Sequence, residues 1–268
     1  MLILLPPSEG KTAPAAGEPA DPAGLWLPRL APARRRILAR LVSLTRRTSA
    51  RGVADSLAVL GLSAGQHAEI ARNAALATAS AAPAAEVYTG VLYEALDAAG
   101  LAPAARAWVD ERAVVFSGLW GVVRLTDRIP AYRCSVGVTL PVVGGLTAYW
   151  KKALSPALDR AAADGPVLDL RSGAYAAMWV PSGGLAERTA AVRVLHERVV
   201  DGEPRRSVVS HFNKATKGRL VRALAEADAA PASVDDLLGV LRDLKFTVEE
   251  RPAAAGRPRQ VDVIVREL

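Results

Sequence analysis

Short apolar runs, bounded by glycine, proline and polar residues, recur along the chain and predict buried strands. Longer segments between them carry apolar residues at helical spacing and predict amphipathic helices. We expect strands at residues 2–5, 114–116, 136–140, 167–170, 178–180, 192–200, 206–210, 246–250 and 261–265. We expect helices at 33–48, 87–98, 104–112, 147–163, 214–228 and 234–243, with a helical hairpin at 53–80. This order predicts one α+β domain over residues 1–268.

The first strand is followed at once by a polar loop. Ser8 and Lys11 lie in this loop, just beyond Pro6 and Pro7. A loop at the carboxyl end of a buried strand is a favourable place for a binding site. Lys11 is a candidate for phosphate contact or, if desolvated, for nucleophilic or base chemistry.

The helical hairpin turns at Leu60-Gly61-Leu62-Ser63. A short apolar-Gly-apolar turn can direct backbone N–H groups at the start of the second helix toward a phosphate, as in sequence-independent DNA contact. Gly61 is therefore a candidate phosphate-binding residue. A packed corner between two helices fits the same four residues. Before this hairpin, we expect residues 13–28 to form a surface loop, with Arg34, Arg35, Arg36 and Arg40 facing solvent on the next helix.

A polar and aromatic loop is expected after the strand at 114–116. Its candidate residues are Arg124, Asp127, Tyr132 and Arg133. Arginine binds phosphate through two parallel hydrogen bonds, the tyrosine offers a stacking face, and Asp127 and Tyr132 are candidates for proton transfer. The alternative is that Asp127 pairs with Arg124 in a structural ion pair beneath a loop.

A second cluster follows the expected β-hairpin of 192–200 and 206–210, at a strand-to-helix junction. Backbone N–H groups at a helix start favour anions. Lys214, Lys217 and Arg219 add positive charge there, and the spacing of the two lysines places them on one helix face. His211 is a candidate general base, because an ordinary histidine titrates near neutral pH. A solvated, charged helix start remains the alternative.

The composition agrees with an anionic partner and a reducing compartment. The formal net charge is +7, and a basic chain attracts nucleic acid, nucleotides or anionic membranes. A single cysteine, Cys134, excludes an internal disulfide and fits the cytoplasm. The histidines have no metal-ligand spacing, and neither a dinucleotide-binding glycine motif nor a Walker motif is present, so we expect no metal and no cofactor. No apolar run is long enough to span a bilayer.

Several segments, taken in order, resemble the YaaA family. They are residues 1–8 with Lys11, Val87-Tyr88-Thr89-Gly90, Ser117 to Gly121 through Tyr132-Arg133, Tyr149-Trp150, and Ser210 to Gly218. The resemblance spans almost the whole chain. It implies a compact α+β body with a mixed β-sheet core, the fold called cantaloupe, and a helix-hairpin-helix element beside a positively charged cleft. It also implies double-stranded DNA binding and protection from hydrogen peroxide by limiting intracellular iron.

Three functions follow as hypotheses. The first is a monomeric cytoplasmic protein that binds double-stranded DNA largely without reading sequence. The second is an enzyme that acts on a nucleotide, nucleobase or damaged base in the same cleft, because polar residues from three strand ends converge there. The third is a regulatory protein contact linked to iron, for which the sequence shows no ligand set.

Overall fold

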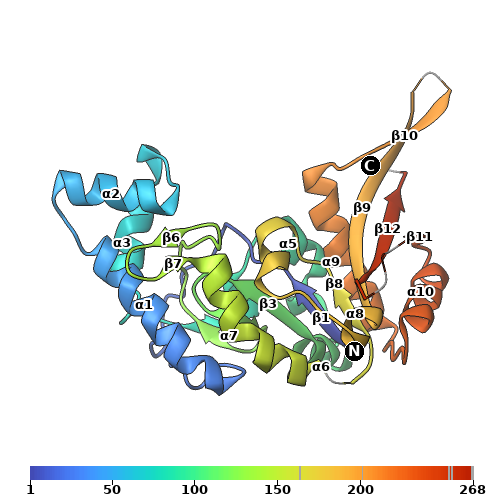
Figure 1. Cartoon of the computed structure of the whole chain (residues 1–268), viewed down its shortest axis with the longest axis horizontal. Coiled ribbons are helices and arrows are strands. Elements are labelled where there is room, and N and C mark those ends of the chain that lie inside the picture. Colours follow the sequence, from blue (N-terminus) through green and yellow to red (C-terminus); the bar gives the residue numbers. More distant parts are fainter. Residues whose placement is uncertain (163, 201, 253, 255, 267–268) are drawn as a thin grey trace.

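A mixed, mostly parallel β-sheet runs through the centre of the molecule (Figure 1). The computed structural model describes residues 1–162, 164–200, 202–252, 254 and 256–266; within these, the side chains of Val200, Ser210 and His211 lie outside the description. The strand order along the sheet is β11-β12-β9-β8-β1-β3-β4, and β10 pairs with β9. This sheet, with helices around it, confirms the α+β prediction.

Strand β1 (Leu2–Leu5) lies inside the sheet because every one of its side chains is apolar and buried. It runs parallel to β3 (Ala113–Ser117) on one side and to β8 (Val167–Asp169) on the other. Strands β9 (Thr189–Val200) and β12 (Arg259–Val265) continue the parallel part.

Three strands of the main sheet run antiparallel to their neighbours: β4 (Gly121–Arg124), β10 (Glu203–Ser207) and β11 (Thr247–Arg251). Short two-residue strands pair elsewhere, β2 (Ala82–Pro83) with β5 (Arg128–Ile129) and β6 (Thr139–Leu140) with β7 (Gly144–Gly145). Strands β9 and β10 form the predicted hairpin, although β10 lies three residues earlier than the expected strand at 206–210. The hairpin extends beyond the body of the molecule (Figure 1).

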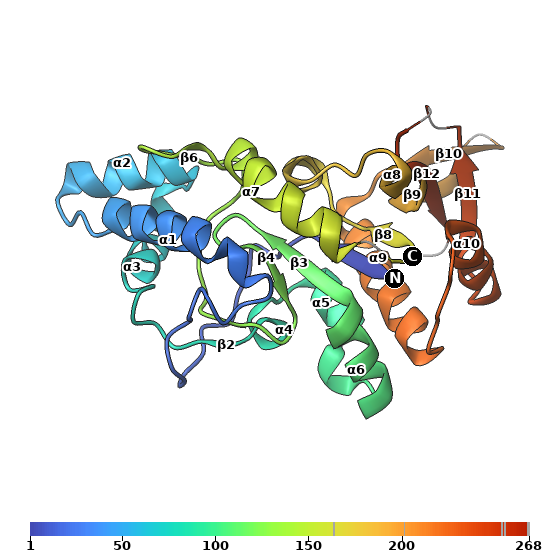
Figure 2. The same ribbon diagram turned by 60° about the horizontal axis from the view of Figure 1, so that its bottom comes forward.

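Helices cover both faces of the sheet. The helices are α1 (Ala31–Thr45), α2 (Ala50–Leu60), α3 (Ala68–Ala74), α4 (Ala84–Val87), α5 (Val91–Leu96), α6 (Pro103–Arg112), α7 (Leu146–Ala161), α8 (Gly184–Glu187), α9 (Ser210–Glu226) and α10 (Val234–Asp243). Helix α7 lies on one side, and α5, α6 and α9 lie together on the other (Figure 2). No helix in the described part of the chain is long and apolar enough to cross a membrane.

The predicted helical hairpin is present as α2, a turn, and α3. Gly61 ends α2 with a left-handed backbone (φ 64°), a conformation that costs glycine little. Ser63 and Gln66 then form a capping box at the start of a short 3-10 turn before α3. The second helix therefore begins at Ala68, four residues later than the sequence suggested.

Several predictions of local structure are wrong, and the helix expected at 87–98 is divided into α4 and α5. Residues 121–124 form strand β4 rather than loop, because Gly121 (φ 74°) allows the chain to reverse tightly after β3. Residues 178–180 form no strand; Met178 ends a 3-10 turn and packs in the core with Trp179. The strand expected at 136–140 shrinks to Thr139–Leu140, and the helix expected from Lys214 begins at Ser210.

Arg34 is buried rather than solvent-facing. Its side chain is 0% exposed, and its guanidinium donates to backbone carbonyls on two segments. The shortest of these bonds reach Trp26 O at 2.6 Å and Val122 O at 2.8 Å. Burial lowers the pKa of Arg34 to about 10. The arginine thus fastens the loop before α1 to strand β4, whereas its neighbours Arg35 and Arg36 are exposed.

Candidate functional site

The candidate site lies at the carboxyl ends of β1 and β8. From β1 the chain proceeds to β3 on one side and later returns to β8 on the other, so a crevice is expected where the connections diverge. A pocket of about 490 Å³ opens there. Its lining includes Ser8, Tyr93, Tyr175, Asn213, Lys214 and Lys217.

One wall is formed by the loop after β1 together with the start of α5. Tyr93 donates from its hydroxyl to Pro6 O (2.7 Å) and stacks on the ring of Tyr88, with 5.3 Å between centroids. The Thr89 N–H donates to Ser8 Oγ at 3.2 Å. These contacts fix the loop after β1, which the sequence predicts to hold a binding site, and they place Ser8 on the pocket surface.

The opposite wall is the amino-terminal half of α9. Gly218 allows this helix to cross α5 closely, since a Cβ atom at that position would collide with the carbonyl oxygen of Leu92. The crossing directs Asn213, Lys214 and Lys217 into the pocket lining. Lys214 and Arg219 are both exposed, but only Lys214 lines the pocket.

Lys217 is buried, with 4% of the residue exposed. Its Nζ donates to Leu170 O at 2.8 Å, at the end of β8. Loss of hydration lowers the pKa of Lys217 to about 8. The negative charge of Asp169 opposes part of this lowering. A phosphate-binding lysine normally keeps its charge in water, so this amine differs in kind from that of Lys214.

Lys11 lies behind the loop of Ser8 rather than on the pocket surface. Its Nζ donates to Ser8 O (2.7 Å) and lies 4.4 Å from the centroid of the Tyr132 ring and 5.5 Å from that of Tyr88. Burial lowers the pKa of Lys11 to about 8. The amine therefore holds the loop against two aromatic faces.

Tyr132 is at the centre of a buried hydroxyl chain. Its hydroxyl lies 2.6 Å from Ser117 Oγ and 2.9 Å from the hydroxyl of Tyr88. Burial raises the pKa of Tyr132 well above its ordinary value, which keeps the phenol neutral. The backbone N–H of Trp120 in turn donates to Ser117 Oγ. These hydrogen bonds connect the loop after β3 to Tyr132, whose ring contacts Lys11.

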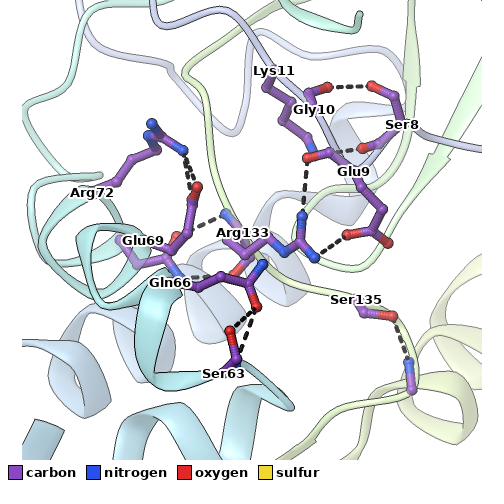
Figure 3. A network of polar contacts seen from close by, with 12 residues as sticks. Ser8, Glu9, Gly10, Lys11, Ser63, Gln66, Glu69, Arg72, Arg133 and Ser135 are labelled. Carbon is purple, nitrogen blue, oxygen red and sulfur yellow. Dashed lines mark hydrogen bonds and ion pairs between the residues drawn. The ribbon is translucent and has the colours of Figure 1, made fainter. Parts of the chain in front are cut away.

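Arg133 joins the loop after β1 to the helical hairpin (Figure 3). Its guanidinium forms an ion pair of 2.8 Å with Glu9. Its backbone N–H and carbonyl are both bonded by the side-chain amide of the buried Asn73 on α3, at 2.9 and 2.7 Å. The predicted proximity of Arg133 to the first loop is present, with a carboxylate already bound to the arginine.

Arg124 and Asp127 lie away from the pocket lining. Asp127 accepts hydrogen bonds from the backbone N–H of Trp26, at 3.1 Å, and of Arg124, at 2.9 Å. Burial raises the pKa of Asp127, and these N–H bonds oppose that rise. The Arg124 guanidinium lies 5.2 Å from the Trp26 ring. Both residues hold the loop before α1, close to where Arg34 binds it.

The remaining candidates are divided between the hairpin and the start of α9. Gly61 lies at the exposed hairpin turn. The side chain of His211 lies outside the described residues. Among the described residues, no three His, Cys, Asp or Glu side chains are close enough to one another to hold a metal ion.

Comparison with known proteins places the chain in a family. Residues 1–251 match the family model described as peroxide stress protein YaaA. The chain belongs to the YaaA family. It is 53% identical over 269 aligned residues to a UPF0246 protein of Streptomyces coelicolor, with both chains fully covered. It is 40% identical to a UPF0246 protein of Corynebacterium glutamicum, over 94% of this chain and 96% of that one.

Several pocket residues of this YaaA family member escaped sequence analysis. Tyr93 and Tyr175 line the pocket from helical segments without a motif. Arg171 and Asp169 support it from below, through a buried ion pair of 2.6 Å. The sequence does carry a signal for Asp169 and Arg171. These two charged residues, separated by Leu170, end an apolar run, a pattern typical of a strand that ends in a loop.

Proposed function

We propose that this YaaA family protein binds double-stranded DNA during peroxide stress, holding backbone phosphate at the pocket rim without reading sequence. The observation that carries the proposal is the position of exposed Lys214 at the mouth of the pocket, on the first turns of α9. A helix start and a lysine together favour a phosphate group. Phosphate contacts position a duplex without identifying its bases.

The size and lining of the pocket suit one nucleotide next to the phosphate that Lys214 would bind. A volume of about 490 Å³ is within the range of small-molecule sites. Tyr93 and Tyr175 supply aromatic surface, and Ser8 and Asn213 supply polar groups. Aromatic surface with a few polar groups suits a base or sugar.

The helical hairpin supports a second contact with the same duplex. Arg133 connects α3 to the loop after β1, which places the hairpin and the pocket loop in one network (Figure 3). At the exposed hairpin turn, Gly61 has no side chain and lets a phosphate along the duplex approach the backbone closely.

Fluorescence anisotropy with a labelled duplex at several salt concentrations tests DNA binding. We expect affinity to fall steeply with salt, and Lys214→Ala to weaken binding and reduce the salt slope by about 1. Lys151→Ala removes an equal charge from the exposed face of α7 and provides the control. Absence of duplex binding at low salt would overturn the proposal.

A second candidate function is an enzyme that acts on a nucleotide or damaged base. Its specific support is Lys217, a buried amine that lines the pocket and whose pKa burial lowers to about 8. Incubation with nucleotides and with damaged duplexes, followed by mass spectrometry of the products, tests for this activity.

We further propose a cytoplasmic monomer. The lone Cys134 is buried, so the described surface offers no thiol for oxidative pairing between copies. Light scattering after gel filtration tests the monomer, and cell fractionation tests the location.

A further inference from the structure

Lys217 is the buried amine that phosphate binding leaves unused. It lines the pocket and makes no ion pair with any carboxylate in the described part of the chain. The nearest acid, Asp169, is bound by Arg171 through both of its carboxylate oxygens, at 2.9 and 2.6 Å. Lys217 is left with the carbonyl of Leu170. A buried charge without a counter-ion is costly, so an amine held in this way is suited to react in its neutral form.

We propose that Lys217 Nζ forms an imine with the aldehyde carbon of a phosphorylated sugar bound in the pocket. The amine attacks the aldehyde carbon through its lone pair. Nitrogen then gives up both of its protons, the carbonyl oxygen leaves as water, and a carbon–nitrogen double bond remains. No oxidant or reductant enters this step.

The surroundings of Lys217 favour this step at neutral pH. Its pKa of about 8 leaves roughly a tenth of the amine neutral at pH 7, far more than for an ordinary lysine. The charged residues around it are Glu9 and Lys214, which line the same pocket, and Asp169 at the end of β8. Arg171 already pairs with Asp169, and the carboxylate of Asp169 only partly opposes the effect of burial on the pKa of Lys217.

Lys214 supplies the second contact that the sugar needs. It precedes Lys217 by three residues on α9, so both side chains lie on one helix face. Lys214 at the rim can bind the phosphate while Lys217, deeper in the pocket, meets the aldehyde. Lys11 is not the reacting amine, because its Nζ packs on Tyr132 behind the loop of Ser8.

Two sources offer this chemistry: the ring-opened deoxyribose at an abasic site in DNA, and a free sugar phosphate. The DNA source rests on the proposed function, whereas the free sugar does not. We would incubate the full chain with sodium cyanoborohydride and either a duplex carrying one abasic site or 2-deoxyribose 5-phosphate. Peptide mass spectrometry would then locate the reduced adduct.

We expect one adduct, on the peptide that contains Lys217. An adduct with the duplex alone identifies DNA as the source, and an adduct with the sugar phosphate alone identifies a metabolite. No adduct with either probe, or adducts on Lys11, Lys214 or exposed lysines instead, overturns the proposal. If the sugar phosphate reacts at Lys217 while duplex binding is absent, only the DNA proposal fails. If the duplex binds and nothing is trapped, only this inference fails.

Two variants separate chemistry from charge. Lys217→Arg retains a positive charge but forms no imine, and Lys217→Met retains the length without the amine. We expect both to lose trapping at least about 10-fold, while Lys151→Arg on α7 traps like the parent. Thermal melting and duplex anisotropy confirm that the variants are folded. Trapping by folded Lys217→Arg at the parent's rate would overturn the assignment.

Discussion

Arg171 binds both carboxylate oxygens of Asp169, with Nε 2.9 Å from Oδ1 and Nη2 2.6 Å from Oδ2. Both residues are buried beneath the pocket, and Arg171 also donates to Trp179 O at 2.8 Å. The pair fastens the loop after β8 and, by engaging Asp169, leaves the amine of Lys217 without a carboxylate partner. This ion pair therefore engages the carboxylate of Asp169, which precedes the Lys217 partner Leu170 in the chain.

Removal of Arg171 should both destabilise the fold and raise the pKa of Lys217. We expect Arg171→Met to lower the free energy of unfolding by about 3–5 kcal/mol, because the buried Asp169 carboxylate loses its partner. Asp169 can then pair with Lys217, so the pKa of Lys217 should rise and aldehyde trapping should slow. Urea unfolding and the trapping rate measure the two effects. Arg47→Met, at an exposed pair with Asp55, is the control and should change unfolding far less.

Replacement of Arg34 should cost far more than replacement of its neighbour. Arg34→Met removes the guanidinium that donates to several backbone carbonyls, including those of Trp26 and Val122, and should destabilise the chain by about 3 kcal/mol or more. Arg35→Met makes the same chemical change on the exposed side of α1 and should stay within about 0.5 kcal/mol of the parent. Equal effects of the two substitutions on urea unfolding would contradict the buried position of Arg34.

Gly118 and Gly137 form a second matched pair. A Cβ atom at Gly118 would collide with the carbonyl of Cys134, and it would lie 2.9 Å from backbone atoms of Ser135 and Val136. Gly118→Ala should therefore destabilise the protein by about 1–3 kcal/mol. At Gly137 the nearest atom is 4.0 Å away, so Gly137→Ala should be tolerated. Thermal melts of both variants provide the comparison, and a Gly118→Ala protein as stable as the parent would contradict this close approach.

The lowered pKa of Lys217 predicts a rise in stability above about pH 8. Between its folded pKa of about 8 and its ordinary value of 10.5, the unfolded chain binds a proton that the folded chain does not. Stability therefore increases with pH in this window, by up to about 1 kcal/mol per pH unit. Lys217→Met should reduce the slope of unfolding free energy against pH by that amount.

Lys11 adds a slope of the same sign, since its folded pKa is also lowered to about 8. Cys134 opposes both lysines above about pH 9, because burial raises the pKa of its thiol to about 12. The comparison of parent and Lys217→Met cancels both contributions. Identical slopes in the two proteins between about pH 8 and about pH 9 would contradict a buried amine at position 217.

Local signals in the sequence located most elements of the fold. The apolar run after Met1 specified strand β1, and the turn at Gly202 specified the β9–β10 hairpin, because both depend on neighbours in the chain. These local signals failed where contacts with distant segments of the chain determine the local structure. Strand β4 depends on pairing with β3, and Met178 becomes part of the core through the elements packed around it.

For the site, the sequence by itself determined the chemical types and the loops: Lys11 and Ser8 after β1, and Lys214 and Lys217 near the start of α9. Only the tertiary structure decided their surroundings. It exposed Lys214, buried Lys217 against Leu170, and placed Lys11 on the Tyr132 ring. It also turned Arg34 inward, a residue indistinguishable in sequence from Arg35. The physical reason is that hydration and charge pairing depend on neighbours brought together by the sheet, and residue type alone does not record them.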